Sequence, residues 1–275
     1  MELTAENYFS EEANKEYMSA TIYKSYAGMT GRHGCEARAV ATLAGEWKTE
    51  PDTPMMVGSY VDAWFEGTLD KFKVKHPELF KRDGDLKAEY RHAEEIIARA
   101  QRDKMFMGFM SGEKQKIFEG ELFGSKWKIK MDSYIPGKAI VDLKVVKEVF
   151  DDDRAEEPKM IWVRDLGYVD WMRYWGYDIQ GAIYQEITYQ NTGERLPFFI
   201  AAIDRQKEPA LQIFHMDNEV LRSALRMVEA NMPRINKIRA GKIEPDRCEC
   251  CEYCRHTKVL SKVIDIHSGY EGKKV

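Results

Sequence analysis

The segment KWKIKMDSYIPGKAIVDLKVV, at residues 126–146, constrains the possible folds of this chain more than any other. Apolar and polar residues alternate through its first part and β-branched residues fill its last part, so both parts are predicted to be strands. The dipeptide Pro136-Gly137 between them indicates a turn. The second strand is apolar enough to lie in a core, yet it carries an acid, Asp142, near its centre.

The two-residue repeat of a strand assigns the side chains of this hairpin to two faces. Apolar side chains share one face of each strand: Trp127, Ile129 and Met131 on the first, and Val141, Leu143 and Val145 on the second. Charged side chains share the other face: Lys128, Lys130 and Asp132, then Asp142 and Lys144. The apolar face of the second strand is expected to pack in the core.

The length of the turn decides whether the two aspartates face the same way. A two-residue turn pairs Asp132 with Val141 and places Asp132 and Asp142 on opposite faces. A three-residue loop that includes Lys138, or a bulge, pairs Asp132 with Asp142 instead. We expect the extra residue, since bulges often redirect side chains beside active sites.

A carboxylate in so apolar a strand needs a partner, because an uncompensated buried charge costs several kcal/mol or shifts its pKa. The partner of Asp142 is Lys144, a group on a neighbouring strand, or a cation. Two carboxylates that share a site repel each other, and a divalent ion relieves that repulsion. Hard oxygen ligands favour Mg²⁺ or Mn²⁺. A surface Asp–Lys pair is the simpler alternative.

Helical patterns precede and follow these strands, and we expect one domain over residues 1–275. Helical patterns cover residues 1–50, with a helix start near Ser19, and a second helix starts at Asp52-Thr53-Pro54. Further helices are expected at residues 86–103, 169–189 and 218–240. The strands are expected at residues 116–123, 126–135 and 139–146 as an antiparallel meander, and at 196–205, with an acidic loop at 151–158. This order predicts an α/β (α+β) fold with a central mixed sheet flanked by helices.

The composition excludes several classes of protein. The 42 basic and 46 acidic residues give a formal charge of −4, which argues against non-specific coating of nucleic acid but allows a local basic groove. No apolar run is long enough to span a membrane, and the N-terminus MELTAENYFSEE is acidic rather than signal-like. We therefore expect a soluble, cytoplasmic protein without membrane partners.

The stretches VGSYVDAWFEG, KMDSY, IVDLKVV and YDIQGAIYQEI together resemble the PD-(D/E)XK nuclease superfamily. Within it they resemble the RecB-like and RecE-like phage-type exonucleases, from about Tyr17 to Lys258. The resemblance implies a restriction-endonuclease-like core. Many RecB-like nucleases have a histidine where this chain has Asp62, and an aspartate there is also able to bind Mg²⁺. The alternative for Asp62 is an acid in the first turn of a helix.

The resemblance also implies the roles of individual residues. Metal binding falls to Asp132, Asp142, Leu143 and Asp62, with Glu66 as an alternative to Asp62. Lys144 orients or helps to activate the attacking water, and its alternative role is a salt-bridged strand lysine. Gln180 and Tyr184, one helical turn apart, match the Gln-x-x-x-Tyr motif that supports the site and contacts the substrate.

Four of the five cysteines crowd into the segment CECCEYC, within a C-terminal motif at residues 245–258. Cys248, Cys251 and Cys254 have a spacing that allows three thiolates to bind one metal centre, with Cys250 or Cys35 as the fourth ligand. Helicase-associated and CRISPR-associated relatives hold an iron–sulfur cluster with one early and three late cysteines, which favours Cys35. The expected group is a 4Fe-4S cluster, with Zn²⁺ or unliganded thiols as alternatives.

These observations predict a Mg²⁺-dependent exonuclease that hydrolyses linear double-stranded DNA from its ends, in phage-type recombination or repair. Expected partners are DNA and a single-strand annealing recombinase, and the resemblance suggests a homo-oligomeric ring. One alternative is a non-catalytic DNA-binding module with a structural metal site, and the other is an endonuclease on the same fold. The aromatic segment WMRYWGYDIQGAIY and the basic runs KFKVKHPELFKR and RINKIRAGK are further candidate DNA contacts, although a core role and solvated faces explain them as well.

Overall fold

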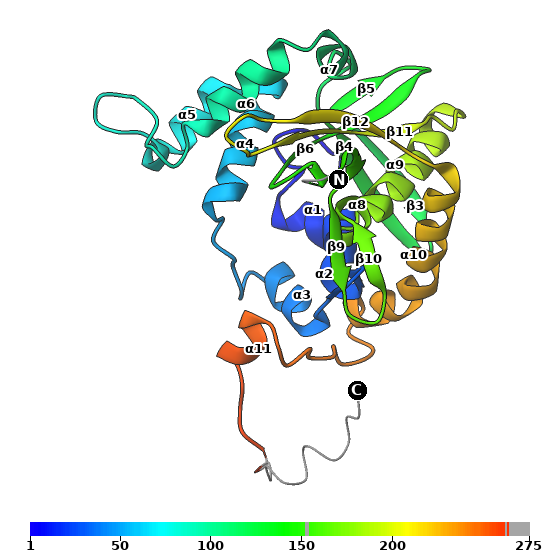
Figure 1. Cartoon of the computed structure of the whole chain (residues 1–275). Helices are drawn as coiled ribbons and strands as arrows, with labels where there is room; N and C mark the ends of the chain where they lie inside the picture. The colour runs from blue at the N-terminus through cyan, green and yellow to red at the C-terminus, as the bar shows by residue number, and fades with distance from the viewer. Residues whose placement is uncertain (152–153, 262, 264–275) are drawn as a thin grey trace.

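A computed structural model of the chain describes residues 1–151, 154–261 and 263 (Figure 1). Its helices are α1 (Glu11–Glu16), α2 (Ala20–Ala27), α3 (Glu36–Leu43), α4 (Thr53–Glu66), α5 (Leu69–Lys75), the 3₁₀ turn η1 (Pro77–Leu79), α6 (His92–Gln101), α7 (Lys104–Phe109), α8 (Trp171–Tyr174), α9 (Tyr177–Thr192), α10 (Asn218–Arg239) and α11 (Glu252–His256). Its strands are β1 (Gly28–Met29), β2 (Arg32–His33), β3 (Lys116–Leu122), β4 (Ser125–Met131), β5 (Ser133–Ile135), β6 (Ala139–Val146), β7 (Phe150–Asp151), β8 (Arg154–Pro158), β9 (Met160–Val163), β10 (Gly167–Asp170), β11 (Phe198–Asp204) and β12 (Leu211–Met216).

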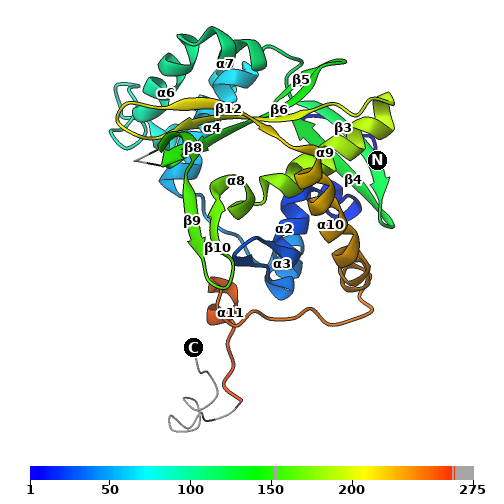
Figure 2. The same ribbon diagram turned by 45° about the vertical axis from the view of Figure 1, so that its right-hand side comes forward.

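The central sheet is mixed, as expected. Its strand order is β12-β11-β6-β5, in which β6 and β11 are parallel and the two outer pairs are antiparallel. The β3–β4 hairpin precedes β5 in the chain and is paired separately. Helices cover both sides of the sheet, with α4, α6 and α7 on one side and α9 and α10 on the other (Figure 2).

Both faces of β6 and β11 are buried, which explains their nearly continuous apolar sequences. Val141 and Leu143 pack in the cluster that includes α4 and α6, whereas Ile140 packs in the cluster that includes α9 and α10. The prediction that Val141 and Leu143 lie in the core is confirmed. Asp142 projects to the same side as Ile140, where α9 lies against the sheet.

The register of the β5–β6 hairpin is the one expected from a three-residue loop. Ile135 pairs with Ala139 and Ser133 with Val141, which leaves Pro136, Gly137 and Lys138 in the turn. Gly137 adopts a φ of +68°, a left-handed conformation that glycine accepts without strain. The same register, continued by one residue, sets Asp132 opposite Asp142.

Two helix starts expected from the sequence are confirmed by their caps. Ser19 accepts a hydrogen bond from the backbone N–H of Ile22 at the start of α2. Asp52 caps α4 through the N–H of Met55, with Pro54 in the first turn. The predicted helix at residues 86–103 is shorter than expected, because α6 begins only at His92.

Other predicted elements are interrupted. Gly176 has a φ of +66° and separates α8 from α9, so the long helix predicted over residues 169–189 is wrong, and residues 167–170 form β10. The strand predicted over 126–135 is broken at Asp132, which lies between β4 and β5. The expected acidic loop instead contributes to the β7–β8 pair, although residues 152 and 153 lie outside the described residues. Strand β12 was not predicted.

None of the helices in the described part of the chain combines the length and the apolar character that crossing a bilayer requires.

Candidate active site

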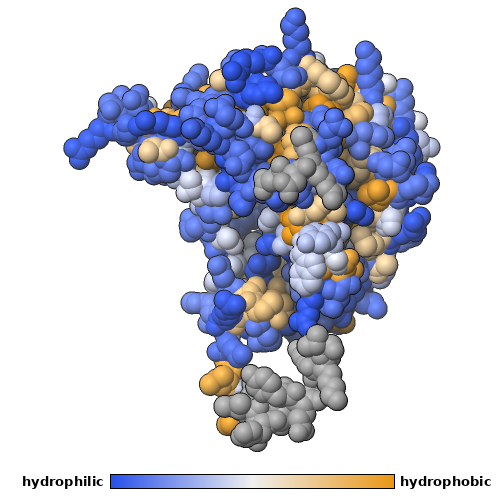
Figure 3. Space-filling model, viewed as in Figure 1, coloured by the Kyte–Doolittle hydropathy of each residue, from blue (hydrophilic) through white to orange (hydrophobic). Residues whose placement is uncertain are grey.

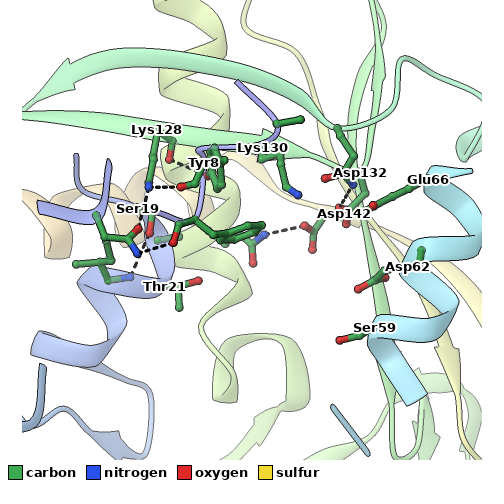
Figure 4. Close-up of a pocket in the computed structure, with 18 of the residues that line it drawn as sticks. Tyr8, Ser19, Thr21, Ser59, Asp62, Glu66, Lys128, Lys130, Asp132 and Asp142 are labelled. Carbon is green, nitrogen blue, oxygen red and sulfur yellow. Dashed lines mark hydrogen bonds between the residues drawn. The ribbon is translucent and has the colours of Figure 1, made fainter. Parts of the chain in front are cut away.

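A cavity of about 1110 Å³ opens on the face of the molecule shown in Figure 3, where hydrophilic side chains surround the hollow. Its walls come from the N-terminal segment, α2, α3, α4, α5, β4, β6 and α9, so residues between Ala5 and Tyr184 that are far apart in the sequence meet there. The expected residues Asp62, Asp132, Asp142, Lys144, Gln180 and Tyr184 all line it. Figure 4 shows Asp132 and Asp142 side by side, with Asp62 and Glu66 directed toward them from α4.

Asp132 is held at the break between β4 and β5 by the backbone of β6. Its Oδ2 accepts a hydrogen bond of 2.8 Å from the N–H of Leu143. The Asp132 carboxylate therefore accepts a hydrogen bond from the backbone of the neighbouring strand β6. In a regular strand the side chain would instead point away from that backbone. The side chain of Leu143 is only 3% exposed and lies in the core, so this residue offers the site its backbone alone.

Asp142 and Lys144 form an ion pair through Oδ2 of the carboxylate and Nζ of the lysine. The Asp142 side chain is 2% exposed, and its burial raises its pKa to about 6 although the Lys144 charge acts in the opposite direction. Burial alone disfavours the ammonium, but Asp142 and Asp132 outweigh it and raise the pKa of Lys144. Lys144 Nζ also donates to the Leu143 carbonyl at 3.0 Å.

Helix α4 contributes both acids that were expected as alternative ligands. Asp62 and Glu66 are one turn apart and both line the cavity. Burial, followed by the negative charge of Asp132, raises the pKa of Asp62 well above its ordinary value. Asp62 lies in the last part of α4, so the alternative of an acid in the first helical turn is wrong.

The Gln-x-x-x-Tyr pair lies on the face of α9 that meets the sheet. Gln180 Nε2 donates to Asp142 Oδ1 at 2.7 Å, and the Tyr184 hydroxyl donates to the Lys130 carbonyl at 3.0 Å. The first bond orients a candidate ligand, and the second fixes β4 where it approaches Asp132. Tyr184 is only 8% exposed, so its main contacts are with other residues of the protein.

Several residues of the cavity were not predicted. Lys24 of α2 lies across from Lys144, and the ring of Tyr177 lies 5.3 Å from Lys24 Nζ and 5.0 Å from Lys144 Nζ. Burial, followed by the Lys144 charge, lowers the pKa of Lys24 to about 8. Gln115, which precedes β3, donates weakly to Asp132 Oδ1 at 3.4 Å. No local sequence pattern marks Lys24 or Gln115, whereas Tyr177 belongs to the stretch YDIQGAIYQEI that carries the resemblance.

The carboxylates fit a hard divalent cation. Asp62, Asp132 and Asp142 offer oxygen atoms around one wall of the cavity, and their mutual repulsion is the condition that such an ion relieves. The Oε1 atom of Gln115 is buried beside Asp132 without a hydrogen-bond partner among the described residues. An unsatisfied oxygen next to three acids is a further donor for a bound ion or its water.

The cysteines meet at one end of the molecule, where α11 lies beside α3 (Figures 1 and 2). The sulfur atoms of Cys35, Cys248, Cys251 and Cys254 all lie within 4.8 Å of one another. Cys250 is exposed and does not belong to this group, so Cys35 is the fourth member. Burial opposes the thiolate of Cys248, but the N–H groups of Cys250 and Cys251 lower its pKa to about 6.

Two of the six distances between these sulfurs match those expected around a single tetrahedral ion, and the other four are at most 4.8 Å. Zinc–sulfur bonds of about 2.3 Å set the sulfurs of a tetrahedral site roughly 3.8 Å apart. The Cys35–Cys254 and Cys248–Cys254 sulfur distances are 3.6 and 3.9 Å. An iron–sulfur cubane places an iron atom between each thiolate and the cluster centre, so its cysteines have to lie further apart.

The other candidate DNA contacts lie in three different environments: the cavity, surface ion pairs and the core. Lys71, Lys75 and His76 of the first basic run line the cavity. The second basic run belongs to the end of α10 and the residues directly after that helix, and its Arg234 forms ion pairs with Glu36 and Asp246. In the aromatic segment, Trp171 is 2% exposed and belongs to the core, in agreement with the core alternative.

Comparisons with known proteins agree with this geometry. The model of the family described as "PDDEXK-like domain of unknown function (DUF3799)" matches residues 19–257. The 2.19 Å crystal structure of a Eubacterium rectale protein, provisionally named an exonuclease, is similar to this chain with a TM-score of 0.93 and 56% sequence identity. The similarity covers 99% of this chain and 100% of that one. A comparison with curated proteins gave no match.

The family match spans most of the chain and includes both the cavity residues from α2 to α9 and the four cysteines. It confirms the resemblance to PD-(D/E)XK nucleases and the α/β core that the resemblance implied. The chain therefore belongs to the PDDEXK-like family DUF3799.

Proposed function

We propose that this protein is a Mg²⁺-dependent DNA exonuclease that hydrolyses phosphodiester bonds from the ends of linear double-stranded DNA. The observation that carries the proposal is the meeting of Asp132, Asp142 and Lys144 in one cavity, with Asp62 facing them from α4. Membership of a PDDEXK-like family and the similarity to a protein provisionally named an exonuclease support the same activity.

The residues that would hold Mg²⁺, or Mn²⁺, are Asp132, Asp142 and Asp62, together with the backbone of Leu143. A divalent ion bound there supplies charge neutralisation at the scissile phosphate and acidifies a bound water. Gln180 keeps the Asp142 carboxylate in one orientation through its hydrogen bond to Oδ1. Glu66, one turn further along α4, hydrogen-bonds the Thr68 hydroxyl at 3.1 Å and is the less available of the two helix acids.

Lys144 contributes a positive charge that does not depend on a metal. Its ammonium is fixed by Asp142, by the Leu143 carbonyl and by the ring of Tyr177. A lysine held in this way donates hydrogen bonds to an attacking water or to a phosphate oxygen. It thereby stabilises the negative charge that develops in phosphodiester hydrolysis.

A free DNA end is the proposed substrate because the described residues form no recognition helix or finger array with which to select an internal sequence. Phosphate contacts then dominate binding, and activity is expected to fall steeply with salt. We further propose a role in phage-type recombination, with a single-strand annealing recombinase as partner and a homo-oligomeric ring as the working form.

The test is digestion of end-labelled linear DNA and of covalently closed circular DNA, with Mg²⁺ and with EDTA. The proposal predicts Mg²⁺-dependent loss of the linear DNA while the closed circle persists. Equal degradation of both forms would favour an endonuclease on this fold. DNA binding without cleavage of either form would favour a non-catalytic module.

We propose that Cys35, Cys248, Cys251 and Cys254 hold a structural Zn²⁺ ion. Their sulfur spacing supports a single ion over the 4Fe-4S cluster that the sequence suggested. Reduced thiolates of this kind suit a reducing compartment such as the cytoplasm. The ion would tie α3 to the C-terminal tail across more than two hundred positions, and closing so long a loop stabilises the folded chain.

A further inference from the structure

Three lysines occupy alternate positions of β4, on the face that leads to Asp132, and their surroundings differ. Lys126 forms an ion pair of 2.8 Å with Glu16. Lys128 is 1% exposed and donates to the Tyr8 carbonyl and, at 2.8 Å, to Asn14 Oδ1. Lys130 lines the cavity, and within the described residues its Nζ makes no hydrogen bond or close ion pair, although its charge acts on Glu66.

The ammonium of Lys130 lies over two aromatic rings of the N-terminal segment. Its Nζ is 4.6 Å from the centre of the Phe9 ring and 5.6 Å from that of Tyr8. Figure 4 shows Lys130 directed into the space between Tyr8 and Asp132. Aromatic faces attract a cation but leave all three of its N–H donors available for a ligand.

Phe9 is unusual in combining exposure with a fixed backbone. Its side chain is 70% exposed although it lines the cavity. The Phe9 carbonyl accepts from Asn14 Nδ2 at 3.4 Å, and the adjacent Tyr8 is anchored by Lys128. The Tyr8 and Phe9 rings meet edge to face at 4.9 Å. An exposed aromatic ring on an anchored backbone loses little freedom when a ligand stacks on it.

We propose that Lys130 and Phe9 form a nucleotide subsite next to the scissile phosphate. Lys130 binds the neighbouring phosphate of the same DNA strand, and Phe9 stacks against a base. This inference rests on the proposed function, because it assumes that the scissile phosphate lies at Asp132 and Asp142. A combination of lysines that follow the backbone and aromatic rings that stack on bases is typical of single-strand binding.

The spacing along the chain supports this assignment. Lys130 and Asp132 are two positions apart, or roughly 7 Å at the rise of a strand, and both side chains face the cavity. Successive phosphates of one strand are separated by a similar distance. The other cavity lysines close to the acids already have partners: Lys144 pairs with Asp142, Lys24 donates to the Trp175 carbonyl at 3.3 Å, and Lys114 donates to the Met110 carbonyl.

The phosphate contact is tested by binding of a fluorescein-labelled single-stranded oligonucleotide in EDTA, where no metal-dependent cleavage occurs. Lys130→Ala and Lys130→Gln are expected to reduce the slope of log K against log salt by about 0.7, the value for one phosphate contact on a single strand. Lys126→Ala is the matched control, since that lysine lies on the same face of β4 but outside the cavity, and it should keep the wild-type slope.

The base contact is tested with oligonucleotides that carry one abasic position at successive sites. Phe9→Ala is expected to weaken binding about tenfold, within the range for stacking of one base. At one abasic position this loss should disappear, because the base that Phe9 contacts is already missing. Trp162→Ala removes another exposed aromatic, outside the cavity, and should change nothing.

The outcomes separate this subsite from the proposed function. An unchanged salt slope in both Lys130 variants, or additive losses for Phe9→Ala at every abasic position, would overturn the subsite even if the wild-type protein degrades DNA. Absence of DNA binding by the folded wild-type protein would overturn the proposed function and the subsite together. Melting temperatures close to that of the wild type show that the variants are folded.

Discussion

Gln180 Nε2 donates a 2.7 Å hydrogen bond to Asp142 Oδ1, and this bond joins the long helix α9 to the central strand β6 at the floor of the cavity. The other oxygen of Asp142 meets Lys144. The Asp142 carboxylate is therefore oriented by Gln180 from a helix and by Lys144 from its own strand. A ligand held at both oxygens loses little freedom when it binds a metal ion.

Replacement of Gln180 by alanine is expected to weaken the binding of Mg²⁺ rather than to abolish activity. Loss of a group that orients a metal ligand typically costs 10–100-fold in metal affinity or activity. The half-saturating Mg²⁺ concentration for DNA cleavage should rise, and high Mg²⁺ should restore much of the rate. Gln190→Ala is the control, since Gln190 lies on the same helix and bonds the backbone of Glu121. An unchanged Mg²⁺ profile for Gln180→Ala would contradict the positioning role.

Asp62→Asn should affect stability in opposite directions with and without metal. In EDTA the variant loses a carboxyl group whose ionisation is opposed first by burial and then by the charge of Asp132, so its melting temperature is expected to rise by a few degrees. In Mg²⁺ it should gain less stabilisation than the wild type, because a ligand is missing. Glu66→Gln, the control, should change both values less. The measurement is the melting temperature of the wild type and both variants in EDTA and in Mg²⁺. A larger effect of Glu66→Gln than of Asp62→Asn would identify Glu66 as the metal ligand instead.

The four-cysteine centre predicts a sharp difference between neighbouring cysteines. Protein purified without oxygen should contain one zinc per chain, and Cys35→Ser should lose the metal and melt at a lower temperature. Cys250→Ser should retain both, because Cys250 is exposed and outside the group of four. Elemental analysis provides the measurement. A brown protein that contains iron would instead identify a cluster, and the absence of both metals would leave four unliganded thiols.

The buried Lys128 should make stability depend on pH in alkaline solution. Burial, with the nearby charge of Arg239, lowers the pKa of Lys128 from its ordinary 10.5 to about 8. Between these values the unfolded chain binds more protons than the folded chain, so the folded state gains stability as the pH rises. The free energy of unfolding of the wild type, minus that of Lys128→Met, should increase from about pH 8 upward and be constant below it. Lys126→Met is the control, and its difference should not rise. The measurement is denaturant titration over this pH range. A constant difference in the free energy of unfolding between the wild type and Lys128→Met would disprove the effect.

The sequence was informative where local chemistry determines structure. The caps at Ser19 and Asp52 mark helix starts, and the expected three-residue loop between β5 and β6 gives the register that sets Asp132 opposite Asp142. The periodicity of the sequence identifies the strands and helices that carry the acids and Lys144, Gln180 and Tyr184. Their places in one cavity were therefore predictable, although their catalytic roles remain proposals.

Apart from the meeting of Cys35 with the late cysteines, which the resemblance implied, several contacts between distant segments were not predicted. The sequence placed Lys128 on the charged face of its strand, and its burial depends on the N-terminal segment more than one hundred positions away. The places of Phe9 and Lys24 in the cavity were missed for the same reason. No sequence pattern near either residue indicates that it contacts β4 or α9. The break at Gly176 was missed because the residues around it keep helical spacing, whereas its left-handed φ becomes visible only in the structure.

The central claim is that Asp142 holds a divalent ion for hydrolysis of DNA, and Asp142→Asn tests it most directly. Asparagine preserves the shape of the side chain but removes the charge that a hard cation requires. The measurement is the rate of digestion of end-labelled linear DNA in Mg²⁺, alongside binding of the same DNA in EDTA. The account predicts that cleavage is abolished while DNA binding remains measurable. Wild-type Mg²⁺-dependent digestion by the folded Asp142→Asn protein would contradict it.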